Sequence, residues 1–279
     1  MEEKKYSDKD LRKLQLVMLD MLKMFDAFCA KHNLKYSLYG GTMIGAVRHH
    51  GFIPWDDDLD VCMEREDYDR FLQLWHQNPP EGYLLQNKEN EEAFTQTFTK
   101  IRKKGTTFLQ YESERGTIHT GIFIDIFPHD RIPPAGISRW LFQLKAMIFQ
   151  LYTREFIPPK SGVVVRMFSK LLLLFTKHKH RMDVRKRLLK CLKKYNNNKS
   201  FDVADTSWLF GIFHPDSSTF WDGKCVTMRF EDAEFQCAPG WDAALRHEYG
   251  DYMQLPPEES RTWKHHPIVL DMDNEIEHK

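Results

Sequence analysis

The sequence predicts a mixed α/β fold, and three stretches carry that prediction. Apolar residues recur at helical spacing over residues 11–29, which predicts an amphipathic helix reaching about His32. Apolar and polar residues alternate over 34–39, and residues 118–127 form a strand-like apolar run. We expect that run to end at Pro128, because a proline donates no hydrogen bond to a ladder. Further elements are expected as a helix over 42–48, a strand over 59–63, a helix over 66–75 and a strand over 98–102.

The pattern of apolar and charged residues changes near residue 133. Apolar segments of helical pattern follow, and the stretch 177–187 then holds six Lys or Arg residues and one Asp. The two apolar segments predict helices over 137–152 and 163–176. We expect three segments that together form one compact unit: a core over 1–132, a helical insertion over 133–200 and a C-terminal region over 201–279.

Bulk composition restricts the classes of function. A chain of 279 residues with 42% hydrophobic residues can bury a core, and its 40 Lys+Arg balance its 40 Asp+Glu, so no net charge draws it to nucleic acid. The five cysteines form no CxxC pair, which favours reduced thiols over a zinc ribbon or a disulfide framework. The first ten residues are charged, so we expect no signal peptide, and no long apolar run predicts a spanning helix. These observations together predict a cytoplasmic location.

An acidic run over 56–60 contains four aspartates. If a strand begins here, Asp58 and Asp60 point to one face, with Cα atoms roughly 6–7 Å apart. Two such carboxylates repel each other unless a cation lies between them, and oxygen ligands of this kind suit Mg²⁺ or Mn²⁺. A solvated acidic turn is the alternative. A calcium-binding helix-loop-helix is excluded, because Val61 stands where that loop needs Gly and Asp67 where it needs Glu.

Two other features favour the metal interpretation. Gly40, Gly41 and Thr42 end a predicted strand and open a predicted helix, so their backbone N–H groups would meet a phosphate, although such a stretch is also an ordinary turn. Asp125 stands among apolar residues of a predicted strand. An ionised carboxylate is costly to bury there unless it is paired or metal-bound, and a satisfied structural Asp remains the alternative.

Three motifs resemble the LicD family of the nucleotidyltransferase superfamily, which more distantly includes fukutin and fukutin-related protein. They are GGTMIGAVRHHGFIPWDDDLDVCMEREDYDRF at 40–71, GIFIDIFPHD at 121–130 and YGDYMQLPPEESRTWKHH at 249–266. The resemblance implies a nucleotidyltransferase-like mixed β-sheet flanked by helices. No motif covers residues 133–200.

The resemblance also implies an activity. LicD-family members transfer a phospho-alcohol, typically phosphocholine from CDP-choline, to a sugar hydroxyl of a capsule, lipopolysaccharide, teichoic acid or lipid-linked precursor, with CMP as the leaving group. Mapped onto this chain, Asp58 and Asp60 would bind Mg²⁺ or Mn²⁺, and Asp125 would complete the site as a ligand or a base. Gly41 and Thr42 would hold the diphosphate.

Supporting groups are less defined by the sequence. Arg48, Lys100 and Arg102 are candidates for neutralising phosphate charge, although a basic residue in such a position is more often an ordinary surface residue. His265 and His266 either contact a phosphate or form a structural pair. Choline would require an aromatic box, and the C-terminal aromatics supply candidates without identifying one.

The apolar-to-basic stretch 163–187 supports two interpretations. It would lie on the inner face of an anionic membrane, or it would pack on the core with a solvated basic end. Two other functions compete with phospho-alcohol transfer. One is transfer of a nucleoside monophosphate to a small acceptor, and the other is a non-catalytic nucleotide-binding module.

Overall fold

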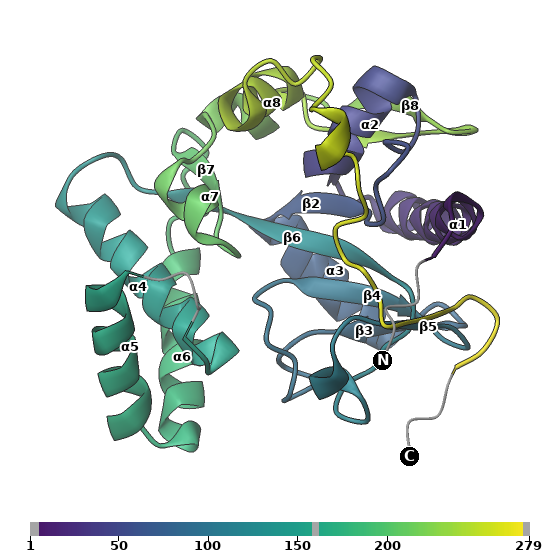
Figure 1. Ribbon diagram of the computed structural model, residues 1–279. Coiled ribbons are helices and arrows are strands. Elements are labelled where there is room, and N and C mark those ends of the chain that lie inside the picture. The colour runs from purple at the N-terminus through teal and green to yellow at the C-terminus, as the bar shows by residue number, and fades with distance from the viewer. Residues whose placement is uncertain (1–5, 158–161, 276–279) are drawn as a thin grey trace. The chain divides into compact units, whose positions relative to one another are not determined.

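The computed structural model describes residues 6–157 and 162–275, and a mixed sheet of six strands is its central element (Figure 1). Five strands follow the order β1-β2-β6-β4-β3, and β7 pairs with β6. The predicted α/β fold is therefore confirmed. The strands are β1 (Ser37–Leu38), β2 (Asp60–Glu64), β3 (Tyr83–Gln86), β4 (Thr99–Lys103), β6 (Phe123–Ile132) and β7 (Asp202–Asp205).

The chain divides into two compact units. One contains the residues up to 86, residues 99–127 and the residues from 220 onward. The other contains residues 87–98 and 128–219, so the predicted helical segment shares a unit with residues on both of its sides. The acidic run belongs to the first unit.

Helix α1 (Asp8–His32) has the predicted length, and its ends are set locally. The Ser7 hydroxyl accepts from the Asp10 amide while the Asp10 carboxylate accepts from Ser7, which is a complete capping box. Asn33 ends the helix in the left-handed conformation. Helix α1 packs on α3 (Arg65–Gln77) through ring contacts such as Phe28 against Phe71, whose centroids lie 5.7 Å apart.

The C-terminal part of the chain returns to the first unit. Strand β10 (Val269–Asp271) pairs antiparallel with β5 (Thr107–Leu109), and the Ile268 amide donates to the Leu109 carbonyl. This ladder fixes the residues just before it beside the main sheet. The same unit contains helices α2 (Gly40–His49) and α8 (Trp241–Tyr249), the hairpin β8 (Val226–Phe230) and β9 (Ala233–Cys237), and the 3₁₀ turns Glu112–Glu114 and Glu258–Ser260.

Strand β6 does not end at Pro128, so that prediction was wrong. Residues 123–126 pair with β4, and residues 129–132 pair with β7. Pro128 therefore lies between two ladders, at a position where its missing N–H removes no bond from either of them. A proline at a change of partner does not interrupt the strand.

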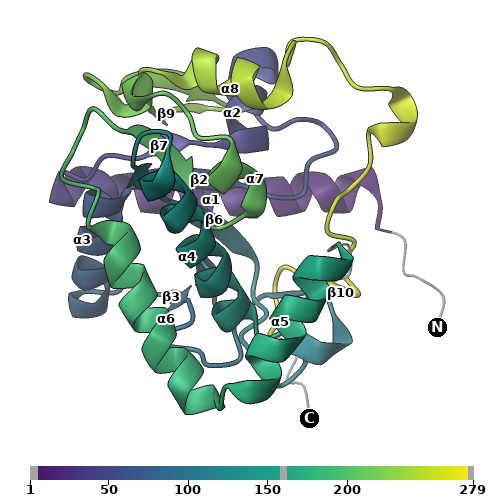
Figure 2. The same cartoon turned by 90° about the vertical axis from the view of Figure 1, so that its left-hand side faces the viewer.

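The second unit is mainly helical, and its helices α4, α5 and α6 are labelled in Figure 2. The predicted helices over 137–152 and 163–176 are confirmed as α4 (Ile137–Arg154) and α5 (Val163–Phe175), and the basic stretch opens α6 (His178–Lys193). Phe142, Phe149 and Leu192 belong to a small core between α4 and α6. A short helix α7 (Leu209–Phe213) and a 3₁₀ turn at Ser218–Trp221 follow. Within the described ranges, no helix has the length and apolarity needed to cross a membrane.

Candidate active site

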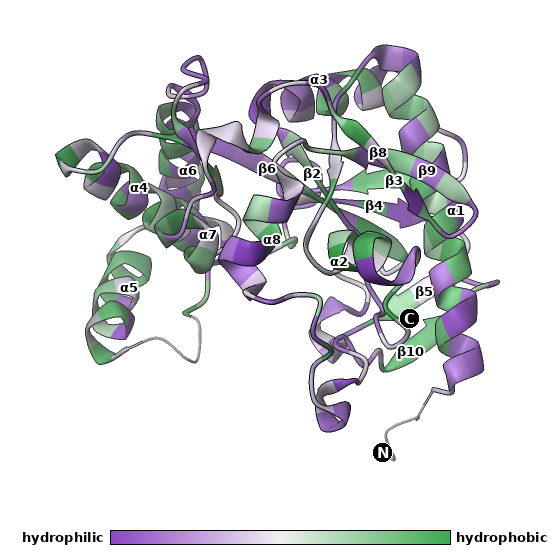
Figure 3. Ribbon diagram, turned by 90° about the horizontal axis from the view of Figure 1, so that it is seen from above, coloured by the Kyte–Doolittle hydropathy of each residue, from purple (hydrophilic) through white to green (hydrophobic). Residues whose placement is uncertain are grey.

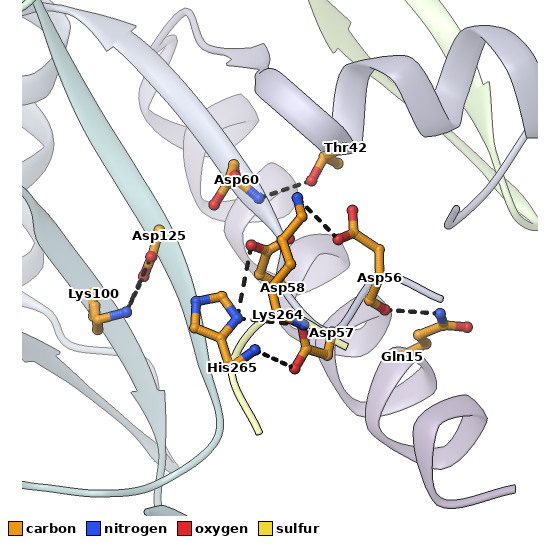
Figure 4. Close-up of polar contacts among 10 residues, drawn as sticks. All are labelled: Gln15, Thr42, Asp56, Asp57, Asp58, Asp60, Lys100, Asp125, Lys264 and His265. Atoms are coloured by element: carbon orange, nitrogen blue, oxygen red, sulfur yellow. Dashed lines mark hydrogen bonds and ion pairs between the residues drawn. The ribbon is translucent and has the colours of Figure 1, made fainter. Parts of the chain in front are cut away.

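Five aspartates gather where β2 meets β6 and the start of α2, namely Asp56, Asp57, Asp58, Asp60 and Asp125 (Figure 4). Asp60 is the first residue of β2, and its amide donates to the Thr42 hydroxyl at 2.8 Å. Asp125 lies on β6, and its amide donates to the Leu59 carbonyl at 2.9 Å. The strand begins one residue later than predicted, so Asp58 precedes it and is placed by the loop that leads into β2. Tertiary pairing thus brings the acidic run and Asp125 together.

Burial and mutual repulsion dominate the electrostatics of these carboxylates. Burial, followed by the negative charges of Asp58 and Asp125, raises the pKa of Asp60 well above its usual value. Burial and Asp58 raise the pKa of Asp56 to about 7. Within the described chain, Oδ1 of Asp56 and Oδ1 of Asp58 are buried and accept no hydrogen bond. A buried carboxylate oxygen without a hydrogen bond is stabilised by a nearby cation.

Asp57 has a different partner, the C-terminal segment at residues 264–265. Its Oδ1 accepts from the Lys264 amide and its Oδ2 from the His265 amide, both at 3.0 Å. The His265 imidazole lies 3.3 Å from Asp57 Oδ1 and 3.8 Å from Asp58 Oδ2. These bonds lower the pKa of Asp57 despite its burial, and the two carboxylates raise that of His265 against the opposing effect of burial. Asp57 therefore fastens residues 264–265 to the acidic run.

Lys264 supplies a positive charge to the cluster. Its Nζ lies 3.4 Å from Asp56 Oδ1, and its side chain remains 58% exposed. Burial lowers the pKa of Lys264, but the carboxylates of Asp56, Asp58 and Asp60 outweigh that effect, so the pKa is raised overall. A half-exposed ammonium held at the edge of a buried acidic cluster is available to an anionic ligand that enters from solvent.

Asp125 already has a positive partner. The Lys100 Nζ donates to both of its oxygens, at 2.7 and 3.0 Å, and each side chain is 8% exposed. The same ammonium lies 3.4 Å from the centre of the Phe123 ring. Burial raises the pKa of Asp125 although Lys100 lowers it, and burial lowers that of Lys100. The sequence predicted Lys100 as a phosphate contact, and the structure shows it bound to Asp125.

The glycines allow a close approach between α2 and the acidic run. Gly40 has a φ of +51°, in the region that favours glycine, and a Cβ there would lie 3.6 Å from Asp60 Oδ2. A Cβ on Gly41 would lie only 2.8 Å from Asp56 Oδ2. The first N–H groups of a helix have no partner within the helix. The start of α2 therefore combines small residues and backbone donors beside the cluster, as a phosphate-binding turn requires.

The other predicted basic residues donate hydrogen bonds to groups outside the acidic cluster. Arg48 donates to the carbonyls of Tyr252 and Gln254, so it holds the C-terminal segment. Arg102 is buried and donates to Gln86 Oε1 and to the Gly121 carbonyl. His266 is exposed with a φ of 40°, whereas His265 reaches the cluster. Of the predicted pair of histidines, the structure brings only one to the aspartates.

The residues partly fit a metal ion. Asp58 Oδ1 accepts no hydrogen bond from the described residues, whereas Asp56 Oδ1 faces Lys264. The free Asp58 oxygen and the raised pKa of Asp60 favour a cation, and Mg²⁺ is commonly held by one or two carboxylates plus substrate phosphates. In the part of the chain that the structure describes, however, no three His, Cys, Asp or Glu side chains are close enough to hold a metal by themselves. Asp58, Asp60 and Asp125 are therefore not assembled in advance as a three-ligand site.

Sequence reasoning missed three members of this site. Asp56 stands in the acidic run but was not among the predicted ligands, and it is buried inside the cluster. Lys264 stood unremarked in the motif that ends in His265, and its proximity to Asp56 depends on the β5–β10 ladder. Tyr249 was one of several aromatics, and its hydroxyl would lie 3.4 Å from a Cβ on Gly40. Its pKa is raised by burial and by nearby carboxylates that include Asp60.

Comparison with known proteins accords with this arrangement. A family described as "LicD/FKTN/FKRP, nucleotidyltransferase domain" matches residues 33–159. The chain is similar to the lipopolysaccharide cholinephosphotransferase LicD of Haemophilus influenzae, with 31% identity over 91% of this chain and 96% of that protein. It is also similar to an uncharacterized protein of Rickettsia prowazekii, with 32% identity over 42% of each chain.

The predicted family resemblance is thereby confirmed. The matched region contains α2, the acidic run and Asp125, and the similarity to the Haemophilus protein extends to nearly the full length of both chains. The chain belongs to the LicD family and is a LicD-type phosphotransferase.

Proposed function

We propose that this enzyme transfers phosphocholine from CDP-choline to a sugar hydroxyl of a lipopolysaccharide or its lipid-linked precursor, with CMP as the leaving group. The observation that carries the proposal is the 31% identity, over 96% of its length, to a lipopolysaccharide cholinephosphotransferase. That name favours lipopolysaccharide over capsule or teichoic acid as the acceptor. The acidic cluster supports the proposal, because phosphoryl transfer depends mainly on positioning and charge neutralisation.

The start of α2 and Lys264 are suited to hold the donor diphosphate. The backbone N–H groups at Gly41 and Thr42 would donate to phosphate oxygens. The Lys264 ammonium, 3.4 Å from Asp56, would contact a phosphate from the exposed side. The donor carries negative charge into an acidic cluster, so these donors and a cation are both needed to bind it.

Asp58 and Asp60 would hold Mg²⁺ or Mn²⁺ together with the donor phosphates. The ion would supply charge neutralisation on the phosphates and on the departing CMP oxygen. Asp58 Oδ1, which accepts no hydrogen bond from the described residues, is the leading ligand atom. The carboxylate of Asp125 would either join this site or accept the proton of the acceptor hydroxyl, and Lys100 fixes its orientation for both roles.

In the reaction, the acceptor oxygen would form a bond to the phosphorus that bears choline. The bond from that phosphorus to the bridging oxygen breaks, and CMP leaves with the electron pair. A nucleotidyltransferase would instead attack the phosphorus that bears the nucleoside, and with CTP it would release pyrophosphate. The two products therefore distinguish the proposed activity from nucleotide transfer.

The test measures CMP after the protein is incubated with CDP-choline, lipopolysaccharide and Mg²⁺. We expect CMP formation that EDTA abolishes, and a loss of at least about 100-fold in Asp58→Asn and Asp60→Asn. Asp222→Asn, which removes an exposed carboxylate of the same unit, serves as the matched control. Full activity in EDTA would overturn the metal assignment, and pyrophosphate from CTP without CMP from CDP-choline would overturn the transfer.

The choice of phospho-alcohol is tested separately by thermal shift. CDP-choline, CDP-ethanolamine, CDP-glycerol and CDP-ribitol are compared in the presence of Mg²⁺, because a ligand that binds only the native state stabilises it. We expect the largest increase in Tm with CDP-choline. A larger increase with another donor would reassign the substrate.

A further inference from the structure

Helix α5 exposes an unusual amount of apolar surface. Seven of its described apolar side chains are between 46% and 83% exposed. Among its described side chains, only Ser169 is buried. Figure 3 shows the hydrophobic colouring along this helix. The seven exposed residues are Val163, Val165, Met167, Phe168, Leu171, Leu174 and Phe175.

Six of these side chains lie on one side of the helix. At about 100° per residue their positions cover an arc of roughly 140°, and Val165 lies about 60° beyond one edge of it. Arg166 and Lys170, both exposed, lie beyond the other edge, and Ser169 lies on the opposite side. An apolar arc with cations along its border is the pattern of a helix that lies in a membrane interface.

The chain that follows adds positive charge. Helix α5 contains no acidic residue, and Asp183 is the single acidic residue of the next stretch, 177–187. Two of the cations in that stretch have acidic partners, since Arg181 lies 3.2 Å from Glu155 and Arg185 lies 2.8 Å from Glu89. Four others are exposed, namely Lys177, Lys179, Lys186 and Arg187.

The helix is anchored to the rest of its unit at its C-terminal end. The Thr176 hydroxyl lies 3.3 Å from the Tyr152 hydroxyl on α4. The Arg181 guanidinium on α6 donates to the Leu173 carbonyl at 3.2 Å. Contacts with α4 and α6 therefore fix the helix that carries the apolar arc. With 13 residues, α5 is shorter than the roughly 20 that a spanning helix needs, so it can lie on a bilayer but cannot cross it.

We propose that α5 docks on an anionic lipid membrane, with its apolar arc at the boundary of headgroups and acyl chains and its bordering cations among the headgroups. The positive charge beside the arc favours a membrane over a second copy of this chain as its partner. A second copy of this chain would bring the same cations to the contact and repel them, whereas anionic lipids attract them. This inference goes beyond the proposed reaction and does not depend on it.

Co-sedimentation of the full chain with vesicles tests the proposal. We expect pelleting with an equal mixture of phosphatidylcholine and phosphatidylglycerol, little with phosphatidylcholine alone, and weaker binding as salt rises. Arg166→Gln with Lys170→Gln should lower the partition coefficient on anionic vesicles about 30-fold, since each cation near the surface contributes about 1 kcal/mol. Leu174→Ser with Phe175→Ser should lower it by more than about tenfold.

Variants on α1 and β8 remove the same number of cations or apolar side chains at sites away from α5, and they serve as controls. Lys9→Gln with Lys13→Gln removes two exposed cations, and Leu16→Ser with Val226→Ser removes two exposed apolar side chains. Both should bind vesicles as the unmodified protein does, and circular dichroism should show all variants folded.

Three outcomes would overturn the proposal. The first is no pelleting with anionic vesicles, and the second is equal binding to both kinds of vesicle. The third is a lipid-free dimer, detected by sedimentation velocity, that the Leu174 and Phe175 changes dissociate while vesicle binding is absent. That last result would assign the arc to a second copy of the chain.

Discussion

Replacement of Lys100 by Met tests how the candidate site is stabilised. The Lys100 Nζ lies 2.7 and 3.0 Å from the two oxygens of Asp125, and both side chains are 8% exposed. Methionine has a similar length and can occupy the same space beside Phe123, but it has no charge. The change therefore removes the charge partner of Asp125 while largely preserving the packing.

The structure sets the expected magnitude. Removing one member of a buried ion pair typically costs about 3–5 kcal/mol, because the other charge stays buried without compensation. Here Asp58 also repels Asp125, which favours the upper part of that range. Replacing both members by apolar residues removes both buried charges and is often nearly neutral. Lys100→Met should therefore lower the free energy of unfolding by about 3–5 kcal/mol, and Lys100→Met with Asp125→Leu should recover most of that loss.

The assay is urea unfolding in the presence of EDTA, followed by circular dichroism and tryptophan fluorescence. Lys104→Met serves as the control, because Lys104 is exposed just beyond the same strand, and a change within about 0.5 kcal/mol is expected there. A loss below about 1 kcal/mol for Lys100→Met would refute the reasoning. A double variant no more stable than the single one would refute it too.

Three further predictions concern other contacts. Gly41→Ala would place a Cβ 2.8 Å from Asp56 Oδ2, so we expect kcat to fall about 10–100-fold with Tm nearly unchanged. Asp57→Ala removes the acceptor of the His265 amide, so hydrogen exchange of that amide should become at least about tenfold faster. The hydrogen-bonded guanidinium of Arg12 lowers the pKa of Glu231 from its usual value of about 4.5. The stability that Glu231 provides is therefore present above pH 4.5 and is lost as pH falls through the lowered pKa. The cost of Glu231→Gln, about 1 kcal/mol in urea unfolding near neutral pH, should therefore shrink as pH falls below about 4.5.

The first two of these predictions have control variants. Gly162→Ala adds a Cβ in open space at an ordinary φ, and it should leave kcat unchanged. Asp222→Asn should not alter exchange at His265. Exchange at His265 that stays slow in Asp57→Ala would show that the β5–β10 ladder alone holds the C-terminal segment. A cost of Glu231→Gln that persists at low pH would assign the effect to packing.

The sequence predicted elements well where local signals determine the structure. The apolar spacing and the capping box at Ser7 were enough for α1, and the Gly-Gly-Thr stretch marked the start of α2. Strand β6 was misjudged at Pro128, because its change of partner from β4 to β7 is a tertiary event with no local signature.

The candidate site was predictable only as far as its motifs reach. Asp58, Asp60 and Asp125 were identified from local pattern, and the structure places them in one acidic region. The partner of Asp125 depends on the register of β4 against β6, in which Lys100 lies opposite Asp125. The role of Asp57 depends on contacts with residues more than 200 positions away. Such contacts follow from the complete fold and not from spacing.

The fastening of residues 264–265 by Asp57 has a consequence for protein synthesis. The acidic run and Asp125 leave the ribosome early, whereas Lys264 follows Asp57 by 207 residues. A nascent chain that has completed α2, β2 and β6 therefore carries clustered carboxylates without the ammonium that later faces them. During that interval, dissolved ions are the available counter-charge, so the order of translation delays assembly of the complete site until nearly the whole chain has emerged.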